Sequence, residues 1–485
     1  MTERTTVLVI GAGPCGLAVA AELARLDVPV TVVDAAPEPG AGSRAILLWP
    51  PVLEVLTELG VADRAREQGL GPAALHYHLP SGVGARVALN DDNRPLVLPQ
   101  EKTTALLEQA VHDFGGTVER GVRVTKVVPG TESVLVAATA DDGTAREFEA
   151  DWVIGADGHR SEVRNQLDIA FDGEHIPVSF LLAEGTLEGD LRRDEVHYFL
   201  SDAGVLLLAP LPGGEFRISG ALPPGAKPDE PQVQRLLDER GPGGLKVASL
   251  RTITTFSSDE RIAANLRADR VFLVGDAAHV HSPIGGQGLN LGIPDGRNLA
   301  WKLAGVHHGR LAPAILDTYD PERRSAIQQT LRATGMMARQ SVAGPVARKV
   351  RNLAWRLAQS SGVLERKFAP TLAGWRSECP NPLPGSGKLA AARSWPRPGT
   401  RDPRWQPKPD RDLAGQFQLV TFGPPNSELA TRAAALATRM PGTVTHFSLG
   451  GSREGFVLLR PDAYVAAAGP AELFPEVARL VRDLA

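Results

Sequence analysis

Apolar and polar positions near the start of the chain predict a strand, a helix and a second strand. Residues 5–10 (TTVLVI) form an apolar run of strand length, and residues 17–26 (LAVAAELARL) continue with helical spacing. A second apolar run, residues 28–33, ends in Asp34. The residues between the first strand and the helix are GAGPCG, at positions 11–16. The pattern therefore predicts a βαβ unit whose first turn is rich in glycine.

Each glycine of this turn has its own physical task. Gly11 permits the tight turn, Gly13 lets backbone approach a pyrophosphate, and Gly16 lets the helix pack closely on the strand. The helix N-terminus offers unpaired N–H groups to phosphates. Asp34 stands where a carboxylate can accept hydrogen bonds from an adenosine ribose. The segment predicts binding of an ADP moiety, which NAD and FAD share, so it does not choose between these two cofactors.

Two later segments favour a flavin. Residues 151–167 (DWVIGADGHRSEVRNQL) place Asp157 and Gly158 between a strand and a helix. A strand followed by a capped helix with no cofactor role would show the same pattern. Residues 271–274 (VFLV) form another strand, followed by GDAAHVHSPIGGQGLN at positions 275–290 and then by a helical pattern. An acid at a strand end can hold a ribityl hydroxyl, and glycines let backbone lie against a flat ring. The following helix N-terminus adds partial positive charge, which stabilises a reduced flavin.

The middle of the chain reads as a sheet and its end as helices and a small module. Residues 196–219 contain the strand-like runs VHYFL, VLLLAPL and FRIS, which predict a sheet covering the other side of the flavin. Apolar residues recur at helical spacing over 346–357 and predict a buried stripe. The proline-rich residues 379–412 predict a connector without regular structure.

Composition excludes several other classes of protein. A chain of 485 residues with 43% hydrophobic and 22% charged residues is ordinary for a globular protein of two or three domains. A net charge of −4 provides no basic field for nucleic acid and no attraction to a membrane surface. No apolar run reaches membrane-spanning length and no signal peptide is evident, so we expect a cytoplasmic location. The cysteines, Cys15 and Cys379, predict neither a disulfide framework nor a metal cluster.

The three glycine-bearing motifs together resemble those of the FAD-dependent aromatic hydroxylases, the single-component group A flavoprotein monooxygenases. GAGPCG, IGADGHRSEVR and GDAAHVHSPIGGQGLN match in order and spacing, and the resemblance is strong over residues 7–319. Within the family the chain is most similar to hydroxylases that tailor aromatic polyketides and related actinobacterial products, as in antibiotic biosynthesis.

The resemblance also implies an α/β fold in which the domains are interleaved along the chain. It implies a Rossmann-like FAD-binding domain from residues 1–75, 99–170 and 266–379, the last with a helical extension. A β-sheet substrate domain would come from residues 76–98 and 171–265. A linker over 380–412 and a thioredoxin-like domain without redox cysteines over 413–485 would follow.

Site residues are carried over from the family by position. The expected FAD contacts are Gly11, Gly13, Pro14, Gly16, Asp34, Arg44, Gln100, Val124, Asp157, Asp276, Pro283, Gly286, Gly288, Leu289 and Asn290. Asp34 and Val124 belong to the adenosine end, Arg44 to the phosphates, and Gln100 and residues 286–290 to the flavin. The chain departs from the family at Thr104, where an acid is common, and in the loop after His281.

The resemblance implies non-covalent FAD, reduced by NAD(P)H as co-substrate, and oxygen transfer through a C4a-hydroperoxyflavin to an aromatic or polyketide-like substrate. Baeyer–Villiger oxidation, epoxidation or oxidative decarboxylation would use the same oxygenated flavin, and a non-catalytic flavin-binding subunit is a further alternative. We assign no catalytic side chain. His76, His78 and His197 are expected to pack on a sheet or face solvent rather than act as a base. We expect no metal, no nucleic-acid or membrane partner, and slightly favour a homodimer over a monomer.

Overall fold

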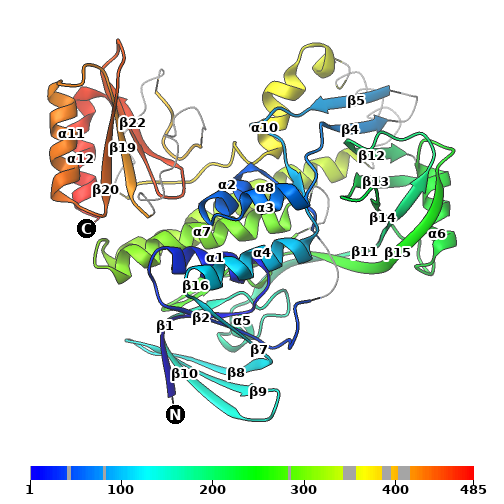
Figure 1. Ribbon diagram of the computed structural model, residues 1–485, viewed down its shortest axis with the longest axis horizontal. Coiled ribbons are helices and arrows are strands. Elements are labelled where there is room, and N and C mark those ends of the chain that lie inside the picture. Colours follow the sequence, from blue (N-terminus) through cyan, green and yellow to red (C-terminus); the bar gives the residue numbers. More distant parts are fainter. Residues whose placement is uncertain are drawn as a thin grey trace.

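The computed structural model describes residues 2–40, 45–79, 83–201, 203–281, 286–341, 355, 357–384, 395–401 and 415–484. Two eight-stranded sheets, a four-stranded sheet and a two-stranded sheet form among these residues. Figure 1 shows the first large sheet at the bottom, the second at the right and the four-stranded sheet at the upper left, with helices between them.

The first sheet has a parallel core. Its strands run in the order β16-β17-β10-β1-β2-β7, and β8 and β9 extend β10 as an antiparallel meander. Residues 7–10 of the first strand are fully buried, as expected for a parallel sheet covered on both faces. The strands are β1 (Thr2–Ile10), β2 (Val30–Asp34), β7 (Thr117–Arg120), β8 (Val122–Pro129), β9 (Val134–Ala140), β10 (Ala145–Gly155), β16 (Arg267–Ala268) and β17 (Val271–Leu273).

Helices cover the first sheet and join it to the rest of the molecule. The helix α1 follows β1 directly and contacts both α4 and α7. The two-stranded sheet of β3 (Leu47–Leu48) and β6 (Leu96–Val97) lies beside them. The helices are α1 (Pro14–Arg25), α2 (Pro50–Glu58), α3 (Ala62–Gln68), α4 (Gln100–Asp113), α5 (Glu162–Gln166), α7 (Gly288–His307) and α8 (Tyr319–Ser341), with short turns η1 (Gly275–Ala277) and η2 (Pro313–Thr318).

The second sheet is largely antiparallel and has two different faces. Its order is β18-β15-β11-β14-β13-β12-β4-β5, and β12 and β4 are parallel. One face packs against α6 (Glu230–Arg240) through Phe199, Leu206 and Leu236. The other face carries Tyr77 and packs with Leu47, Trp49 and Leu364. The strands are β4 (Ala74–Leu79), β5 (Val83–Ala88), β11 (Phe171–Glu188), β12 (Glu195–Ser201), β13 (Gly204–Pro210), β14 (Phe216–Ala221), β15 (Lys246–Ala263) and β18 (His279–Val280).

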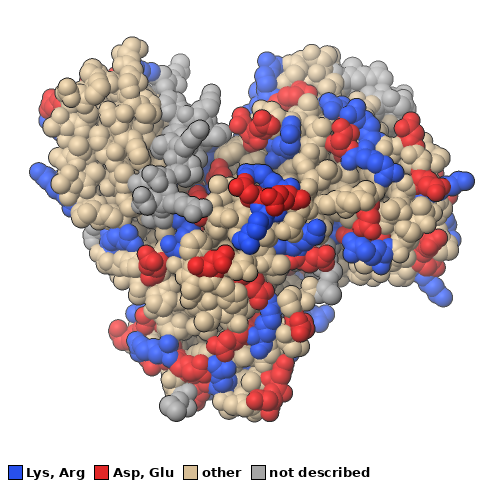
Figure 2. All heavy atoms as spheres, in the orientation of Figure 1, with Lys and Arg blue, Asp and Glu red and all other residues tan. Residues whose placement is uncertain are grey.

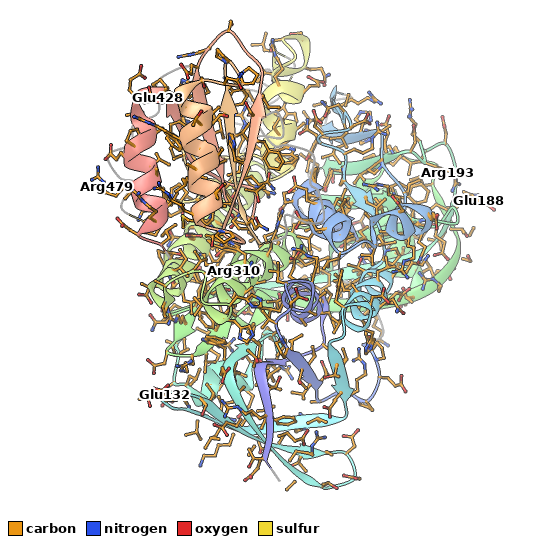
Figure 3. The ribbon with its side chains drawn as sticks, turned by 60° about the vertical axis from the view of Figure 1, so that its left-hand side comes forward. Glu132, Glu188, Arg193, Arg310, Glu428 and Arg479 are labelled. Carbon is orange, nitrogen blue, oxygen red and sulfur yellow. The ribbon has the colours of Figure 1, made fainter. Side chains whose placement is uncertain are left out.

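The C-terminal residues form the four-stranded sheet, with order β20-β19-β21-β22. Arg310, which follows α7, donates to the carbonyl of Gly442 at 2.9 Å and so joins this part to the first sheet's helices (Figure 3). The elements are β19 (Phe417–Phe422), α11 (Glu428–Arg439), β20 (Val444–Leu449), β21 (Gly455–Leu459), β22 (Val465–Pro470), η6 (Ala471–Leu473) and α12 (Phe474–Arg482), preceded by η3 (Leu364–Phe368) and α10 (Ala369–Leu372).

A network of buried charges fixes this C-terminal sheet to α7 and α8. Arg460, fully buried at the end of β21, donates to Glu322 of α8 at 2.7 Å and to Asp462 at 2.6 Å. Lys302 of α7 also donates to Glu322, at 3.0 Å. Asn298 of α7 donates to Asp462 at 2.9 Å. The C-terminal sheet is therefore anchored through hydrogen-bonded charges rather than through apolar contacts alone.

Several expectations from the sequence can be compared with these elements. The runs at 196–219 form β12, β13 and β14 as predicted. Most of the expected stripe over 346–357 lies outside the described residues. Its described member Leu357 is 61% exposed, so the prediction that this residue is buried is wrong.

Acidic and basic side chains intermingle on the face drawn in Figure 2. Within the described ranges, no helix has both the length and the apolar character needed to cross a bilayer.

Candidate cofactor site

The three motifs meet at one edge of the first sheet. They follow β1, β10 and β17, which are adjacent and parallel, so their carboxyl ends share that edge. Ala156 donates its N–H to the carbonyl of Ile10 at 2.8 Å, and Val274 donates to Gly155 at 3.0 Å. Ligands of open α/β sheets bind outside the carboxyl ends of such strands. Three segments that are distant in sequence thereby form one candidate site.

The first motif leaves open space where a ligand can approach. Gly11 has φ = 112°, and a Cβ there would lie 2.4 Å from the carbonyl oxygen of Ala156. A Cβ on Gly16 would lie 2.0 Å from the carbonyl oxygen of Gly11. A Cβ on Gly13, in contrast, would meet no atom within 4 Å. Pro14 begins α1, which has no side-chain cap, so its first N–H groups remain available to an anion.

The residues expected at the adenosine end and beside the flavin lie on different elements of the chain. Asp34 ends β2, and its carboxylate accepts from the N–H groups of Ala12 at 2.6 Å and Ala36 at 2.7 Å. Gln100 begins α4 and accepts from the N–H of Ala45 at 3.1 Å. Val124 is buried on β8, where the strand register shifts between Val124 and Lys126. Two further expected contacts, Arg44 and Pro283, lie outside the described residues.

The second motif supports the site from within the protein. Asp157 accepts from the N–H groups of Glu162 at 2.7 Å and Val163 at 3.1 Å, and so caps α5. Its Oδ1 is buried and has no hydrogen-bond partner among the described residues, and burial raises the pKa of this carboxyl. Arg164 is buried and donates to the carbonyl of Ala277 at 2.8 Å, which ties this motif to the third. The carboxylate of Asp157 is thus used largely by α5, leaving Oδ1 for another donor.

In the third motif, Asp276 is exposed at the edge of the site. Its side chain makes no hydrogen bond or ion pair with any described residue, which leaves the carboxylate available to a ligand. Next to it, the Sγ of Cys15 packs between Gly275 and Gly292. A Cβ would lie 2.8 Å from this sulfur if added to Gly275 and 2.4 Å from it if added to Gly292, so neither position has room for a side chain. Desolvation, followed by the charges of Asp276 and Asp295, raises the pKa of Cys15 well above its usual range. Cys15 is therefore an unreactive packing residue.

The helix α7 begins beside this loop without a side-chain cap. Gly286 has φ = 61°, a backbone conformation that favours glycine. Gly288 and Leu289 form the first turn of α7, and Leu289 is buried. The side chain of Asn290 is engaged within the protein: it donates to the carbonyls of Leu47 at 2.7 Å and Gly286 at 2.8 Å and accepts from Trp49 N–H at 2.8 Å. Any contact of Asn290 with a flavin would therefore come from its backbone.

Sequence reasoning missed Asp295, which holds the third motif in place. This fully buried residue of α7 accepts from Gly275 N–H at 3.1 Å, His279 Nε2 at 2.7 Å and Arg323 Nε at 2.6 Å. Burial alone would raise the pKa of Asp295, but the charges and hydrogen bonds of His279 and Arg323 outweigh it and lower that pKa. Asp295 follows Pro294 directly and is the single acid of residues 288–307, and this was the available signal.

The face of the second sheet that carries Tyr77 has stacked aromatic rings and a buried ion pair. Tyr77 and Tyr198 stack with ring centroids 4.9 Å apart, and Trp355 lies 5.1 Å from Tyr77. Leu47 packs in the same cluster and also lies closest to the Cβ position of Gly286, which links this face to the third motif. Sequence reasoning also missed Arg217, which pairs with Glu184 on this face, because only the strand register reveals the pair.

Comparison with known proteins identifies the family. The FAD binding domain family matches residues 4–334. The chain is 32% identical to a 6-methylpretetramide 4-monooxygenase of Streptomyces rimosus over 96% of this chain and 90% of that one. It is 33% identical to a rifampicin monooxygenase of Streptomyces venezuelae, covering 74% of this chain and 76% of that one. The chain therefore belongs to the FAD-binding monooxygenase family and is an FAD-dependent monooxygenase of the aromatic hydroxylase type.

Solved structures share the whole fold. A flavin-dependent monooxygenase, PieE, in complex with FAD and substrate matches with a TM-score of 0.80 at 24% identity, covering 99% of both chains. The anhydrotetracycline hydroxylase OxyS from Streptomyces rimosus matches with a TM-score of 0.78 at 24% identity, again over 99% of both. At this identity the likeness concerns the fold, which includes the C-terminal sheet as well as the two large sheets.

Proposed function

We propose that this enzyme transfers one atom of molecular oxygen to an aromatic, polyketide-like intermediate, using NAD(P)H as the reductant. The observation that carries the proposal is the meeting of three motifs at one sheet edge, with the uncapped N-termini of α1 and α7 beside them. Relatives named for 6-methylpretetramide and anhydrotetracycline support a polycyclic aromatic substrate. FAD, reduced by NAD(P)H, would supply the activation of oxygen.

The residues present fit both the pyrophosphate of FAD and the flavin ring, which gains negative charge on reduction. The open space at Gly13 and the free N–H groups of α1 suit a pyrophosphate, and Asp34 retains acceptor capacity for a ribose. The Asp276 carboxylate has no partner among the described residues and would bind hydroxyl groups between the phosphates and the ring. The first turn of α7 would place partial positive charge beside the ring, where reduction adds negative charge. Arg44 and Pro283 remain proposed contacts from the family resemblance.

The second sheet would hold the substrate against this site and exclude water. Tyr77, Tyr198 and Trp355 provide apolar aromatic surface in the cluster that reaches the third motif through Leu47. Water exclusion matters because a solvated site loses activated oxygen as hydrogen peroxide. Arg217 and Glu184 are buried on the same face and pair with each other, so they stiffen the sheet there. We assign orientation of the substrate to this face and propose no general acid or base.

The experiment measures whether reductant consumption depends on an aromatic substrate. Purified enzyme is assayed with NADH or NADPH under ¹⁸O₂, with 6-methylpretetramide and an anhydrotetracycline as probes. We expect faster NAD(P)H consumption with at least one probe and a product carrying one ¹⁸O atom. Substrate-independent oxidation that returns all oxygen as hydrogen peroxide with every aromatic polyketide tested would contradict the proposal. A Baeyer–Villiger product or an epoxide would correct the type of oxygen transfer but not the oxygen source.

For the C-terminal sheet we propose a thioredoxin-like scaffold without redox chemistry. Its parallel pair β19–β20, antiparallel β21–β22 and the helices α11 and α12 support this reading. The chain contains two cysteines, and neither falls within residues 413–485, so no dithiol is available there. We further propose the domain boundaries given by the family resemblance and a homodimer formed with this scaffold. The cytoplasmic location remains a prediction from the sequence.

A further inference from the structure

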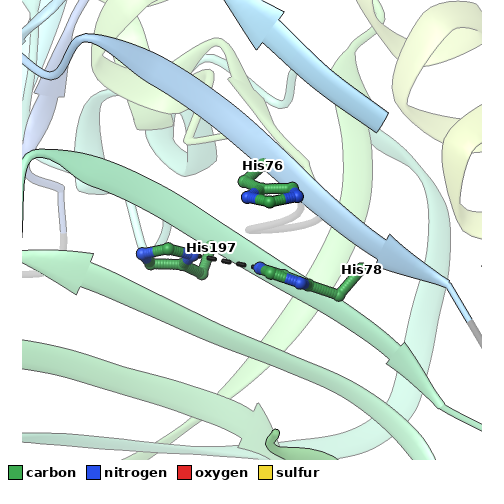
Figure 4. Close-up of side chains that lie close together, drawn as sticks. All are labelled: His76, His78 and His197. Atoms are coloured by element: carbon green, nitrogen blue, oxygen red, sulfur yellow. Dashed lines mark hydrogen bonds between the residues drawn. The ribbon is translucent and has the colours of Figure 1, made fainter. Parts of the chain in front are cut away.

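Three histidines gather on the face of the second sheet that points away from the candidate FAD site. His76 and His78 lie on β4 and His197 lies on β12, where His76 pairs in register with His197 (Figure 4). Their neighbours Tyr77 and Tyr198 point to the opposite face, as alternation along a strand requires. One nitrogen from each histidine lies within 4.8 Å of the others. The cluster is thus separate from the residues assigned to oxygen transfer.

A hydrogen bond on the outer side of the His197 ring fixes which of its nitrogens faces the centre of the cluster. His197 Nε2 lies 2.8 Å from the carbonyl oxygen of Arg192, which can only accept, so Nε2 carries the hydrogen and Nδ1 presents a lone pair. His78 Nε2 lies 3.0 Å from that Nδ1 (Figure 4). Transfer of the His78 ring hydrogen from Nε2 to Nδ1, the other neutral tautomer, would leave two lone pairs directed at the same point.

A buried carboxylate occupies the corresponding position behind His76. Glu195 is fully buried, and its Oε2 lies 3.3 Å from His76 Nδ1 yet accepts no hydrogen bond from any residue that the structure describes. Arg86 and Arg192 bind the other oxygen, Oε1, at 2.9 Å and 3.0 Å. A proton on His76 Nδ1 would satisfy Oε2 and leave His76 Nε2 free as a ligand. Metal-binding histidines commonly have such a carboxylate or carbonyl on the second ring nitrogen.

We propose that His76, His78 and His197 form a binding site for a divalent transition-metal ion of the Zn²⁺ type. Imidazole nitrogen suits Zn²⁺, Ni²⁺ and Cu²⁺, and the cluster lacks the oxygen ligands that Mg²⁺ or Ca²⁺ requires. Tetrahedral Zn²⁺ with Zn–N distances of about 2.0–2.1 Å separates its ligand nitrogens by about 3.4 Å. One pair of nitrogens is 3.0 Å apart and all three lie within 4.8 Å of one another, so rotations of the side chains would bring them to that spacing.

The bound ion would cross-link two strands, β4 and β12, that are distant in the sequence. β4 and β12 pair in parallel here, and they belong to segments more than a hundred residues apart. Phe199 stacks on His78 at 4.2 Å and limits the movement of that ring. Because the ion binds only the folded sheet, it would raise the stability of the enzyme in proportion to its occupancy. The site therefore serves the structure of the substrate sheet rather than the oxygen chemistry.

The test uses the full-length, FAD-loaded enzyme after removal of metals with a chelator. Zn²⁺ alone is titrated in competition with a chromophoric chelator, and metal content is measured by mass spectrometry. We expect one ion per chain and a rise in melting temperature that saturates with it. His76→Ala and His78→Ala should each weaken binding at least about tenfold, and Glu195→Gln by about 10- to 100-fold. Far-UV circular dichroism and flavin absorbance establish that each variant is folded.

His175→Ala provides the matched control. His175 lies on β11 of the same sheet, is exposed, and has Asp259 as its partner at 2.9 Å, so it offers a single imidazole. This variant should bind Zn²⁺ as the unaltered enzyme does. The proposal is overturned if the unaltered enzyme binds no Zn²⁺, or if His76→Ala and His78→Ala bind it with unchanged affinity. Equal weakening by His175→Ala would likewise overturn it, because binding would then be a property of scattered histidines.

Discussion

Arg164 donates a hydrogen bond of 2.8 Å to the carbonyl oxygen of Ala277, and so connects two motifs that are 113 residues apart. A second bond from Arg164 reaches the carbonyl of His159 at 2.9 Å, and its guanidinium lies 3.8 Å from the ring centre of Phe171. The planar guanidinium can satisfy all of these contacts at once, which a lysine cannot. The turn that carries Asp276 is therefore positioned by the second motif and not only by its own strand.

Asp276→Ala should weaken FAD binding without lowering protein stability. The side chain is exposed and has no described protein partner, so its loss removes only a ligand contact. A charge-assisted hydrogen bond of roughly 1.5–3 kcal/mol corresponds to a one- to two-decade rise in the FAD dissociation constant. Asp295→Asn is the contrast, since it disturbs a buried acid with three partners and should lower the melting temperature. Unchanged FAD affinity in Asp276→Ala would remove this residue from the site.

Gly13→Val should produce a folded but colourless protein. The backbone at Gly13, with φ = −76° and ψ = 173°, is extended and accepts any residue, and a Cβ there meets no protein atom within 4 Å. The side chain would instead occupy the position proposed for the pyrophosphate. The ratio of flavin to protein absorbance after gel filtration measures the effect. Gly450→Val, at another glycine whose Cβ would meet nothing within 4 Å, should remain yellow. A yellow Gly13→Val protein would place the phosphates elsewhere.

Gly286→Val should uncouple oxygen use from product formation. Gly286 has φ = 61°, which a β-branched residue adopts only with strain, and its carbonyl accepts from Asn290. The shifted loop should admit water beside the flavin and raise the ratio of hydrogen peroxide to hydroxylated product. Gly286→Asn is the matched variant, because asparagine tolerates this conformation better, and it should stay closer to normal coupling. Normal coupling in both variants would make this loop an ordinary turn.

Removal of residues 413–485 should cost stability more than it alters the flavin spectrum. The deletion would leave buried Glu322 and Lys302 without Arg460 and Asp462. The point variant Arg460→Met tests the same contact in the full chain and should destabilise it by about 3 kcal/mol, the cost of breaking a buried charge pair. Arg439→Met, at an exposed position of α11, is the control. Equal melting temperatures for the full and truncated chains would contradict the scaffold role.

Stability should fall as the pH rises from about 4.5 to about 7 because of Glu58. Burial raises the pKa of Glu58 to about 7, and neighbouring Arg297 only partly opposes this. In that pH range the folded chain binds a proton that the unfolded chain has released, so rising pH favours unfolding. Glu58 lines a cavity of about 310 Å³ between α2, α7 and β21. Urea unfolding from pH 5 to 8 should show a flatter dependence in Glu58→Gln, whereas exposed Glu67→Gln should match the unaltered enzyme.

The sequence by itself determined the elements and motifs whose physical causes are local. Glycine spacing, an apolar strand and a helix start are all contained in residues 5–34, so the first turn and Asp34 could be placed from that short segment alone. The alternation of His76, Tyr77 and His78 likewise predicted which side chains share a face.

Only the tertiary structure decided which distant side chains meet. Asp295 reaches Gly275 and His279 because α7 lies back across the third motif, and this packing has no local signal in the sequence. The three histidines converge because β4 and β12 pair in one particular register, and a shift by a single residue would turn His197 to the opposite face. Strand register and helix packing are set by the whole core. The contacts of buried Asp295 and the histidine cluster could therefore not be predicted from the sequence alone.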